Sequence, residues 1–121
     1  MSKAYVRFEM PEDLIDTVYE AVEQTRDTGK LHKGTNEVTK VIERGHAVFV
    51  VMAMDVVPEE VVMHIPYICE EKNIPYAYVP SKNELGRAAG LSVSTASVAI
   101  TKPGKAKTLV EGLSDRLKKI K

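Results

Sequence analysis

The feature that most constrains the fold is an almost wholly apolar run at residues 47–53, AVFVVMA. The run is rich in β-branched residues and lacks the alternation of a strand that has one face in water. Unbroken apolar strands occur where both faces of a sheet are covered. We therefore expect residues 47–53 to form a central strand with helices packed on both sides.

The chain before this run begins with a helix signal. Pro11 opens a predicted helix with Glu12 and Asp13 in its first turn, where the helix dipole favours acids. The helix should end before Gly29, and residues 30–33 form a short link or strand.

After the apolar run, helix and strand signals alternate. Strands are expected at residues 76–79 and 96–101, and helices at 58–64, 66–73, 81–90 and 105–120. Ser81 and Glu84 have the spacing of a capping box, which supports the helix at 81–90. This alternation predicts an α/β domain whose helices cover both faces of a small sheet, a three-layer sandwich. At 121 residues the chain fits one domain spanning 1–121.

The overall charge gives no sign of a nucleic-acid partner. Seventeen basic and seventeen acidic residues cancel. Their placement is uneven, because residues 9–23 hold six acids and no Lys or Arg, whereas residues 102–107 hold three lysines and no acid. A neutral chain of this kind can carry a basic face opposite an acidic one.

The single cysteine, Cys69, excludes an internal disulfide and a cysteine-based zinc site. It lies in an apolar stretch, which predicts a buried, unreactive thiol in a reducing compartment. No apolar run approaches the roughly 20 residues of a membrane span, and the charged N-terminus does not resemble a signal peptide. We expect a cytoplasmic protein.

Residues 33–45, KGTNEVTKVIERG, predict a helix with two unlike faces. Thr35 is expected to be the N-cap, because its hydroxyl can accept from a free backbone N–H, and Gly45 is expected to end the helix. The spacing divides the side chains into an apolar face of Val38, Val41 and Ile42 and a polar face of Asn36, Glu37, Lys40 and Arg44.

The polar face favours contact with nucleic acid. Lys40 and Arg44 lie four residues apart, where like charges repel by roughly 0.2–0.5 kcal/mol; a bound anion would offset this, although an ordinary solvated face also explains the pattern. Backbone N–H groups of residues 34–36 can meet a phosphate. Glu37 would repel a phosphate but can accept from a base amino group, and Lys40 can donate to guanine. With the amide of Asn36, this set suits base edges.

A second candidate is the small, partly apolar loop at residues 91–95, LSVST. Such a loop would suit van der Waals contact with a base outside a stack, a common way of reading irregular RNA. A simple lead-in to the following strand also explains it.

Motifs for catalysis or cofactor binding are missing. The sequence contains no dinucleotide-binding or phosphate-loop pattern and no GxSxG, and its three histidines show no metal-ligand spacing. We expect no cofactor, metal or catalytic residue. The alternative is a small α/β enzyme or metabolite-binding domain that uses Asp55, which follows the apolar strand; the same residue could cap the helix at Pro58. A docking role for the acidic first helix is compatible with RNA binding.

Five segments carry a resemblance to a known family: KGTNEVTK with ERG at 33–45, DVVPEE at 55–60, HIPY at 64–67, IPYAYV at 74–79 and LGRAAG at 85–90. In this order, over nearly the whole chain, they resemble the archaeal large-subunit ribosomal protein family "L-seven-Ae", which binds kink-turn RNA. The resemblance implies a three-layer α-β-α sandwich around a small mixed four-stranded sheet.

The resemblance also implies the RNA and the residues that meet it. Kink-turns and kink-loops bend at tandem sheared G·A pairs beside a three-nucleotide bulge. Residues matching Asn36, Glu37 and Lys40 contact the guanines of those pairs. The backbone is approached by Lys33, Gly34, Thr35 and Arg44, the bulged nucleotides are covered by Leu91, Ser92, Val93 and Ser94, and the extruded base lies near Lys82.

The implied partners are rRNA of the large subunit, box C/D and H/ACA guide RNA, and ribonuclease P RNA. In box C/D particles the bound RNA recruits Nop5 and fibrillarin, and methyl transfer belongs to fibrillarin. We expect a monomer.

This chain departs from relatives around the extruded base. Several archaeal relatives carry a glutamate where Ser92 stands, eukaryotic ones have arginine near Val93, and some have an acid where Val57 stands. A more apolar cover predicts tolerance of any base at the bulge, with the G·A pairs carrying specificity.

Overall fold

The computed structural model describes residues 5–120. Its helices, including two short 3-10 helices (η1 and η2), and its strands follow in the order α1 (Glu12–Thr28), β1 (Lys30–Lys33), α2 (Thr35–Glu43), β2 (Phe49–Ala53), η1 (Glu59–Val61), α3 (His64–Glu71), β3 (Tyr76–Val79), α4 (Lys82–Ala88), β4 (Ser97–Lys102), η2 (Gly104–Ala106) and α5 (Lys107–Ile120).

The four strands form one mixed sheet in the order β1-β4-β2-β3. Strand β4 is antiparallel to both β1 and β2, and β2 is parallel to β3. All residues of β2 are buried, which confirms the predicted central strand. The strand begins at Phe49 rather than Ala47, and Val48 just before it is 41% exposed.

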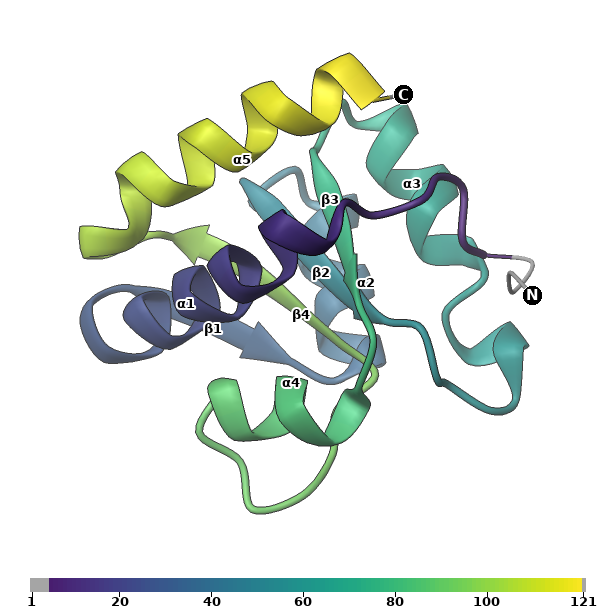
Figure 1. The fold of residues 1–121 in the computed structure, drawn as a ribbon. Helices are drawn as coiled ribbons and strands as arrows, with labels where there is room; N and C mark the ends of the chain where they lie inside the picture. The colour runs from purple at the N-terminus through teal and green to yellow at the C-terminus, as the bar shows by residue number, and fades with distance from the viewer. Residues whose placement is uncertain (1–4, 121) are drawn as a thin grey trace.

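Helices cover both faces of this sheet (Figure 1). On one face α1 packs against α4 and α5; on the other, α2 packs on β1 and β4 and contacts α3. The predicted three-layer α-β-α sandwich around a mixed four-stranded sheet is therefore confirmed. It leaves the strand ends, and the loops that follow them, at the edges of the sandwich.

The segment before α1 is tied to the sheet by buried tyrosines. The hydroxyl of Tyr5 donates to the carbonyl of Ala53 at 2.7 Å, and the hydroxyl of Tyr78 donates to the carbonyl of Tyr5 at 2.6 Å. Burial raises the pKa of Tyr78 to about 12. These bonds hold the segment at Tyr5 against β2 and β3.

Two predicted helices begin differently in the structure. The helix expected from Pro58 is only the turn η1, and α3 begins at His64 rather than at Pro66. Pro66 is tolerated in the first turn of α3 because an N–H there has no helical partner. The last helix opens as η2 and becomes α-helical at Lys107. None of the helices in residues 5–120 is long and apolar enough to cross a membrane.

Candidate nucleic-acid interface

One edge of the sheet gathers most of the residues predicted to meet RNA. Strand β1 leads directly into α2, and the N–H of Gly34 between them donates to the carbonyl of Ser97, the first residue of β4, at 3.2 Å. The loop at residues 91–96 enters β4 at this point. The start of α2 and the end of this loop therefore lie side by side.

The start of α2 differs from the prediction. Thr35 is the first helical residue, and the N-cap is Gly34, whose φ of 90° strongly favours glycine. The hydroxyl of Thr35 lies 3.4 Å from that of Ser97 instead of capping the helix. The prediction that Thr35 is the N-cap was therefore wrong. The prediction that the N–H of Gly34 is free to meet a phosphate was also wrong, because this N–H donates to the carbonyl of Ser97.

The two faces of α2 are as predicted. The apolar face is buried and the polar face is exposed, with Val38, Val41 and Ile42 on the first and Asn36, Glu37, Lys40 and Arg44 on the second. The helix ends at the expected glycine, since Gly45 has a φ of 73° and its N–H donates to the carbonyl of Ile42 at 2.9 Å.

The polar face has a near end and a far end. Asn36 and Glu37 lie in the first turn of α2, beside the loop, whereas Arg44 is its C-cap. At 1.5 Å per residue, Arg44 lies about 12 Å along the axis from Asn36. Lys40 lies between them, about 6 Å along the axis from each.

The carboxylate of Glu37 has a partner that the sequence did not predict. Nδ1 of His32, on β1, lies 2.7 Å from Oε1 of Glu37. The five-residue separation matches neither helix nor strand periodicity. The contact exists only because the chain turns at Gly34, so sequence periodicity carries no signal for it.

The four predicted cations are available to an outside anion. Within residues 5–120, Lys33, Lys40, Arg44 and Lys82 form no ion pair with another side chain. Lys40 and Arg44 are exposed, and Lys33 and Lys82 are half-buried.

The loop after α4 packs closely on that helix. A Cβ on Gly86 would lie only 2.2 Å from the carbonyl oxygen of Val93, so only glycine allows this close approach. The N–H of Thr95 donates to the carbonyl of Lys82 at 3.2 Å. The structure thus brings Lys82 to the loop, whose Val93 is 68% exposed; Ser92 and Ser94 are also exposed, and Leu91 is half-buried.

A hollow of about 260 Å³ lies between α4 and this loop, lined by Asn83, Arg87, Leu91, Ser92, Val93 and Ser94. Asn83 and Arg87 were not among the predicted residues. Their separation of four residues places them on one face of α4. That face is recognisable as part of the hollow only once the loop is known to fold back over Gly86.

The N-terminus of α4 is fixed by two side chains. Ser81 accepts from the N–H of Glu84 at 3.1 Å, which confirms the predicted cap. Oδ1 of Asp55 accepts from the N–H of Lys82 at 2.9 Å. The expectation that Asp55 caps a helix at Pro58 was wrong, because the parallel pairing of β2 with β3 brings Asp55 to the segment after β3 instead.

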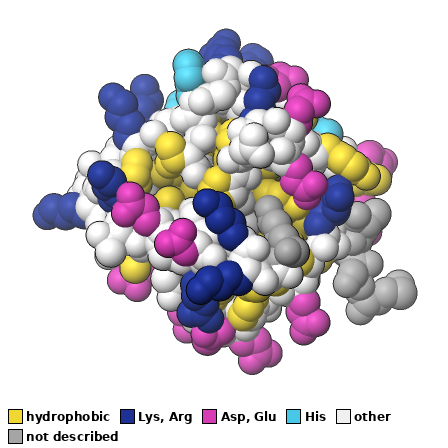
Figure 2. Space-filling model, turned by 90° about the horizontal axis from the view of Figure 1, so that it is seen from above, with side chains coloured by type: hydrophobic (Ala, Val, Ile, Leu, Met, Phe, Trp, Pro, Cys, Tyr) yellow, Lys and Arg dark blue, Asp and Glu magenta, His cyan; other side chains and the backbone are white. Residues whose placement is uncertain are grey.

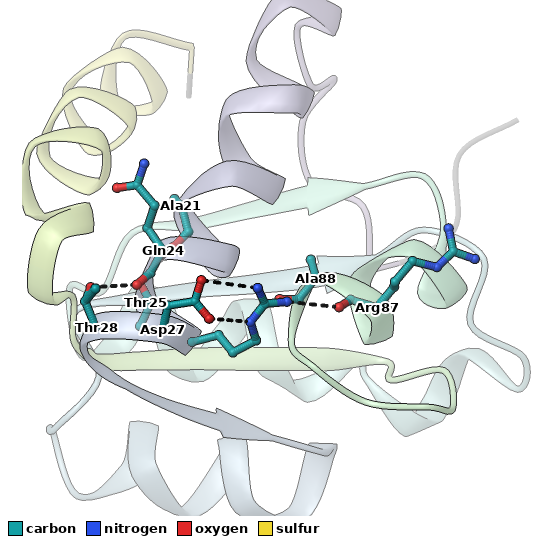
Figure 3. Close-up of polar contacts among 8 residues, drawn as sticks. Ala21, Gln24, Thr25, Asp27, Thr28, Arg87 and Ala88 are labelled. Carbon is teal, nitrogen blue, oxygen red and sulfur yellow. Dashed lines mark hydrogen bonds and ion pairs between the residues drawn. The ribbon is translucent and has the colours of Figure 1, made fainter.

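The C-terminus of α4 is held by α1 (Figure 3). A guanidinium nitrogen of Arg26 donates to the carbonyl of Ala88 at 3.1 Å and to that of Arg87 at 3.4 Å. Asp27 holds the same guanidinium through a 2.9 Å contact, and the hydrogen bond from Arg26 lowers the pKa of Asp27. Both ends of the helix that supports the loop are therefore anchored.

The opposite side of the molecule has a different character. Seen from above in Figure 2, the face on the α5 side intersperses basic and acidic side chains with apolar ones. The described side chains of that face thus form no broad positive field of the kind that attracts polyanions. Among residues 5–120 no group of three or more His, Cys, Asp or Glu side chains could hold a metal ion.

Comparisons with known proteins agree with this architecture. Residues 16–110 match the model of the "Ribosomal protein L7Ae/L30e/S12e/Gadd45 family". A solved structure, the "Giardia lamblia 15.5kD RNA binding protein", is similar with a TM-score of 0.91 and 30% sequence identity, covering 100% of this chain and 100% of that chain. The matched range contains α2, α4 and the loop between α4 and β4. The chain therefore belongs to the ribosomal protein L7Ae/L30e/S12e/Gadd45 family.

Proposed function

We propose that this chain is an RNA-binding protein that recognises and stabilises kink-turn or kink-loop RNA. Its membership of a ribosomal protein family and its similarity to a protein described as RNA-binding support binding to RNA. The observation that carries the finer proposal is the exposed set of Asn36, Glu37 and Lys40 on the helix whose start lies beside the end of the loop before β4.

Asn36, Glu37 and Lys40 act as the base-reading group. Lys40 donates to guanine O6 and N7, and Glu37 accepts from a guanine or other base amino group. The G·A pairs of a kink-turn expose such edges in a widened groove. An acid in this position favours base edges over phosphates, because a phosphate would repel it.

The RNA backbone passes the margin of this group. Lys33 and Arg44 supply positive charge, and Thr35 and Asn36 supply the N–H groups that the helix geometry leaves free. Gly34 contributes differently, because no atom lies within 4 Å of the position of its absent side chain. A phosphate backbone can therefore approach closely there.

The loop residues Leu91, Ser92, Val93 and Ser94 cover the bulged nucleotides, with Lys82 beside the extruded base. The structure places Lys82 and the loop together through the bond from Thr95. This loop presents to the nucleotides the exposed methyl groups of Val93 and the hydroxyls of Ser92 and Ser94.

The RNAs of this class that the chain would serve are rRNA, box C/D and H/ACA guide RNA, and ribonuclease P RNA. In this role it acts as a monomer in the cytoplasm and without catalysis, and the RNA that it bends recruits Nop5 and fibrillarin. The carboxylate of Asp55 is engaged with the N–H of Lys82, so no observation favours the alternative of an enzyme built on this residue.

A gel-shift assay with two RNAs tests the proposal. One RNA contains a kink-turn, and the other has its sheared G·A pairs changed to Watson–Crick pairs. We expect strong binding to the first and weak, salt-sensitive binding to the second, since only phosphate contacts remain. Equal binding to both would refute kink-turn recognition.

A further inference from the structure

The contact between His32 and Glu37 joins a half-buried ring to an exposed carboxylate. The side chain of His32 is 18% exposed and that of Glu37 is 58% exposed, and Nδ1 lies 2.7 Å from Oε1. An ionised carboxylate only accepts hydrogen bonds, so Nδ1 carries the proton and donates. Strand β1 holds the backbone of His32, and its imidazole contacts the carboxylate.

The fold brings these two side chains together. His32 lies in β1 opposite Ala99 of β4, which sets its position in the sheet. Gly34 then turns the chain into α2, which places Glu37 in the first helical turn above the strand. The imidazole reaches the carboxylate from the strand side and leaves the solvent side open.

The contact engages one carboxylate oxygen and leaves the other available. Within residues 5–120 no other hydrogen bond or ion pair reaches the carboxylate of Glu37. Lys33 and Lys40, the cations closest to Glu37 in sequence, form no ion pair with it. The direction of the carboxylate is therefore set by His32, and Oε2 remains free to accept from a base.

We propose that His32 is a positioning residue that preorganises Glu37 for base recognition. An exposed glutamate loses side-chain conformational entropy when it is ordered. Because His32 orders Glu37 before RNA arrives, less of this cost falls on binding. The inference rests on the proposed function, since it concerns the same base-reading group.

A double-mutant cycle tests the inference. The variants are His32→Leu, which removes the donor, His32→Asn, whose amide N–H stands near the place of Nδ1, Glu37→Ala, and His32→Leu combined with Glu37→Ala. His46→Leu is the control, because His46 is a second histidine near α2 but lies past its far end. Dissociation constants are measured for the kink-turn RNA and its Watson–Crick counterpart.

We expect His32→Leu to weaken binding to the kink-turn RNA about two- to tenfold, the range of one net hydrogen bond, and to leave the Watson–Crick RNA unaffected. His32→Asn should restore most of the loss, and His46→Leu should bind like the wild type. In the Glu37→Ala background, His32→Leu should cause no further loss.

The outcomes separate this inference from the proposed function. Equal binding of both RNAs by the wild-type protein would overturn the function. If the wild type discriminates between the RNAs, two results would overturn only the positioning role. One is an equal loss of affinity from His32→Leu with and without Glu37, and the other is an equal loss for both RNAs. A general loss of stability would persist in the Glu37→Ala background, so it cannot imitate the expected result.

Discussion

Oδ1 of Asp55 accepts a hydrogen bond from the backbone N–H of Lys82 at 2.9 Å. The contact joins the end of β2 to the first turn of α4, across the parallel pairing of β2 with β3. The carboxylate accepts from an N–H that has no partner within the helix, and its negative charge interacts favourably with the helix dipole. Asp55 is therefore a structural part of the platform that carries Lys82 and the loop.

Asp55→Ala should destabilise the protein by roughly 0.5–2 kcal/mol, the usual cost of losing a cap, and should also weaken RNA binding because α4 shifts. Asp55→Asn retains an acceptor and should lose less. Urea denaturation of the three proteins measures the difference. Unchanged stability in Asp55→Ala would show that the contact contributes nothing.

Lys40→Ala should reduce affinity for kink-turn RNA by ~5- to 150-fold, because a donor pair to a guanine edge is lost. The Watson–Crick RNA should be bound almost as before, and the thermal unfolding of the variant should be unchanged, since Lys40 is exposed. Binding titrations with both RNAs measure the two affinities.

Arg44→Ala is the matched contrast, because Arg44 lies on the same face at the far end of α2. If Arg44 contacts a phosphate, its loss should weaken the binding of both RNAs alike. It should also reduce the slope of log affinity against log salt by about 1. If Lys40→Ala behaved in this way instead, Lys40 would be a phosphate contact rather than a base reader.

Strong local patterns predicted much of the fold. The apolar run at residues 47–53 gave the central strand because burial on both faces removes polar positions from the sequence. The faces of α2, its end at Gly45 and the cap at Ser81 followed from helix periodicity and local hydrogen bonding. Each of these signals lies within a few residues.

Three of the wrong or missing predictions depend on contacts between distant segments. Thr35 lost the capping position to Gly34 because Gly34 must turn the chain beside Ser97. The partner of Asp55 follows from the pairing of β2 with β3. Asn83 became part of a hollow only through the return of the loop over α4. No local periodicity encodes these relationships.

Folding stability should fall in strongly alkaline solution, partly because of Tyr78. Burial raises its pKa from 10.0 to about 12 in the folded protein. The unfolded chain therefore loses this proton near pH 10 and the folded protein near pH 12. The stabilisation is complete below pH 10 and disappears as the pH rises through about 12. Tyr78→Phe should lose less stability over this interval in urea denaturation, and an equal loss would contradict the assignment.

Gly86→Ala should displace the loop without disturbing α2. The added Cβ would stand 2.2 Å from the carbonyl oxygen of Val93, so the loop backbone must move away. Binding of kink-turn RNA should weaken, whereas the discrimination between G·A and Watson–Crick pairs should persist. Gly112→Ala is the control, because no atom lies within 4 Å of its added Cβ. Wild-type affinity in Gly86→Ala would show that the loop does not cover the RNA.

The identity of the extruded base should matter little. Val93 is 68% exposed and its neighbours in the loop are a leucine and two serines. Methyl groups contact any base by dispersion, and serine hydroxyls both donate and accept, so neither discriminates strongly between base edges. Kink-turn RNAs that carry each of the four bases at this position should bind with comparable affinity in parallel titrations. A large preference for one base would mean that another group, such as Asn83 or Arg87 in the hollow beside the loop, reads its edge.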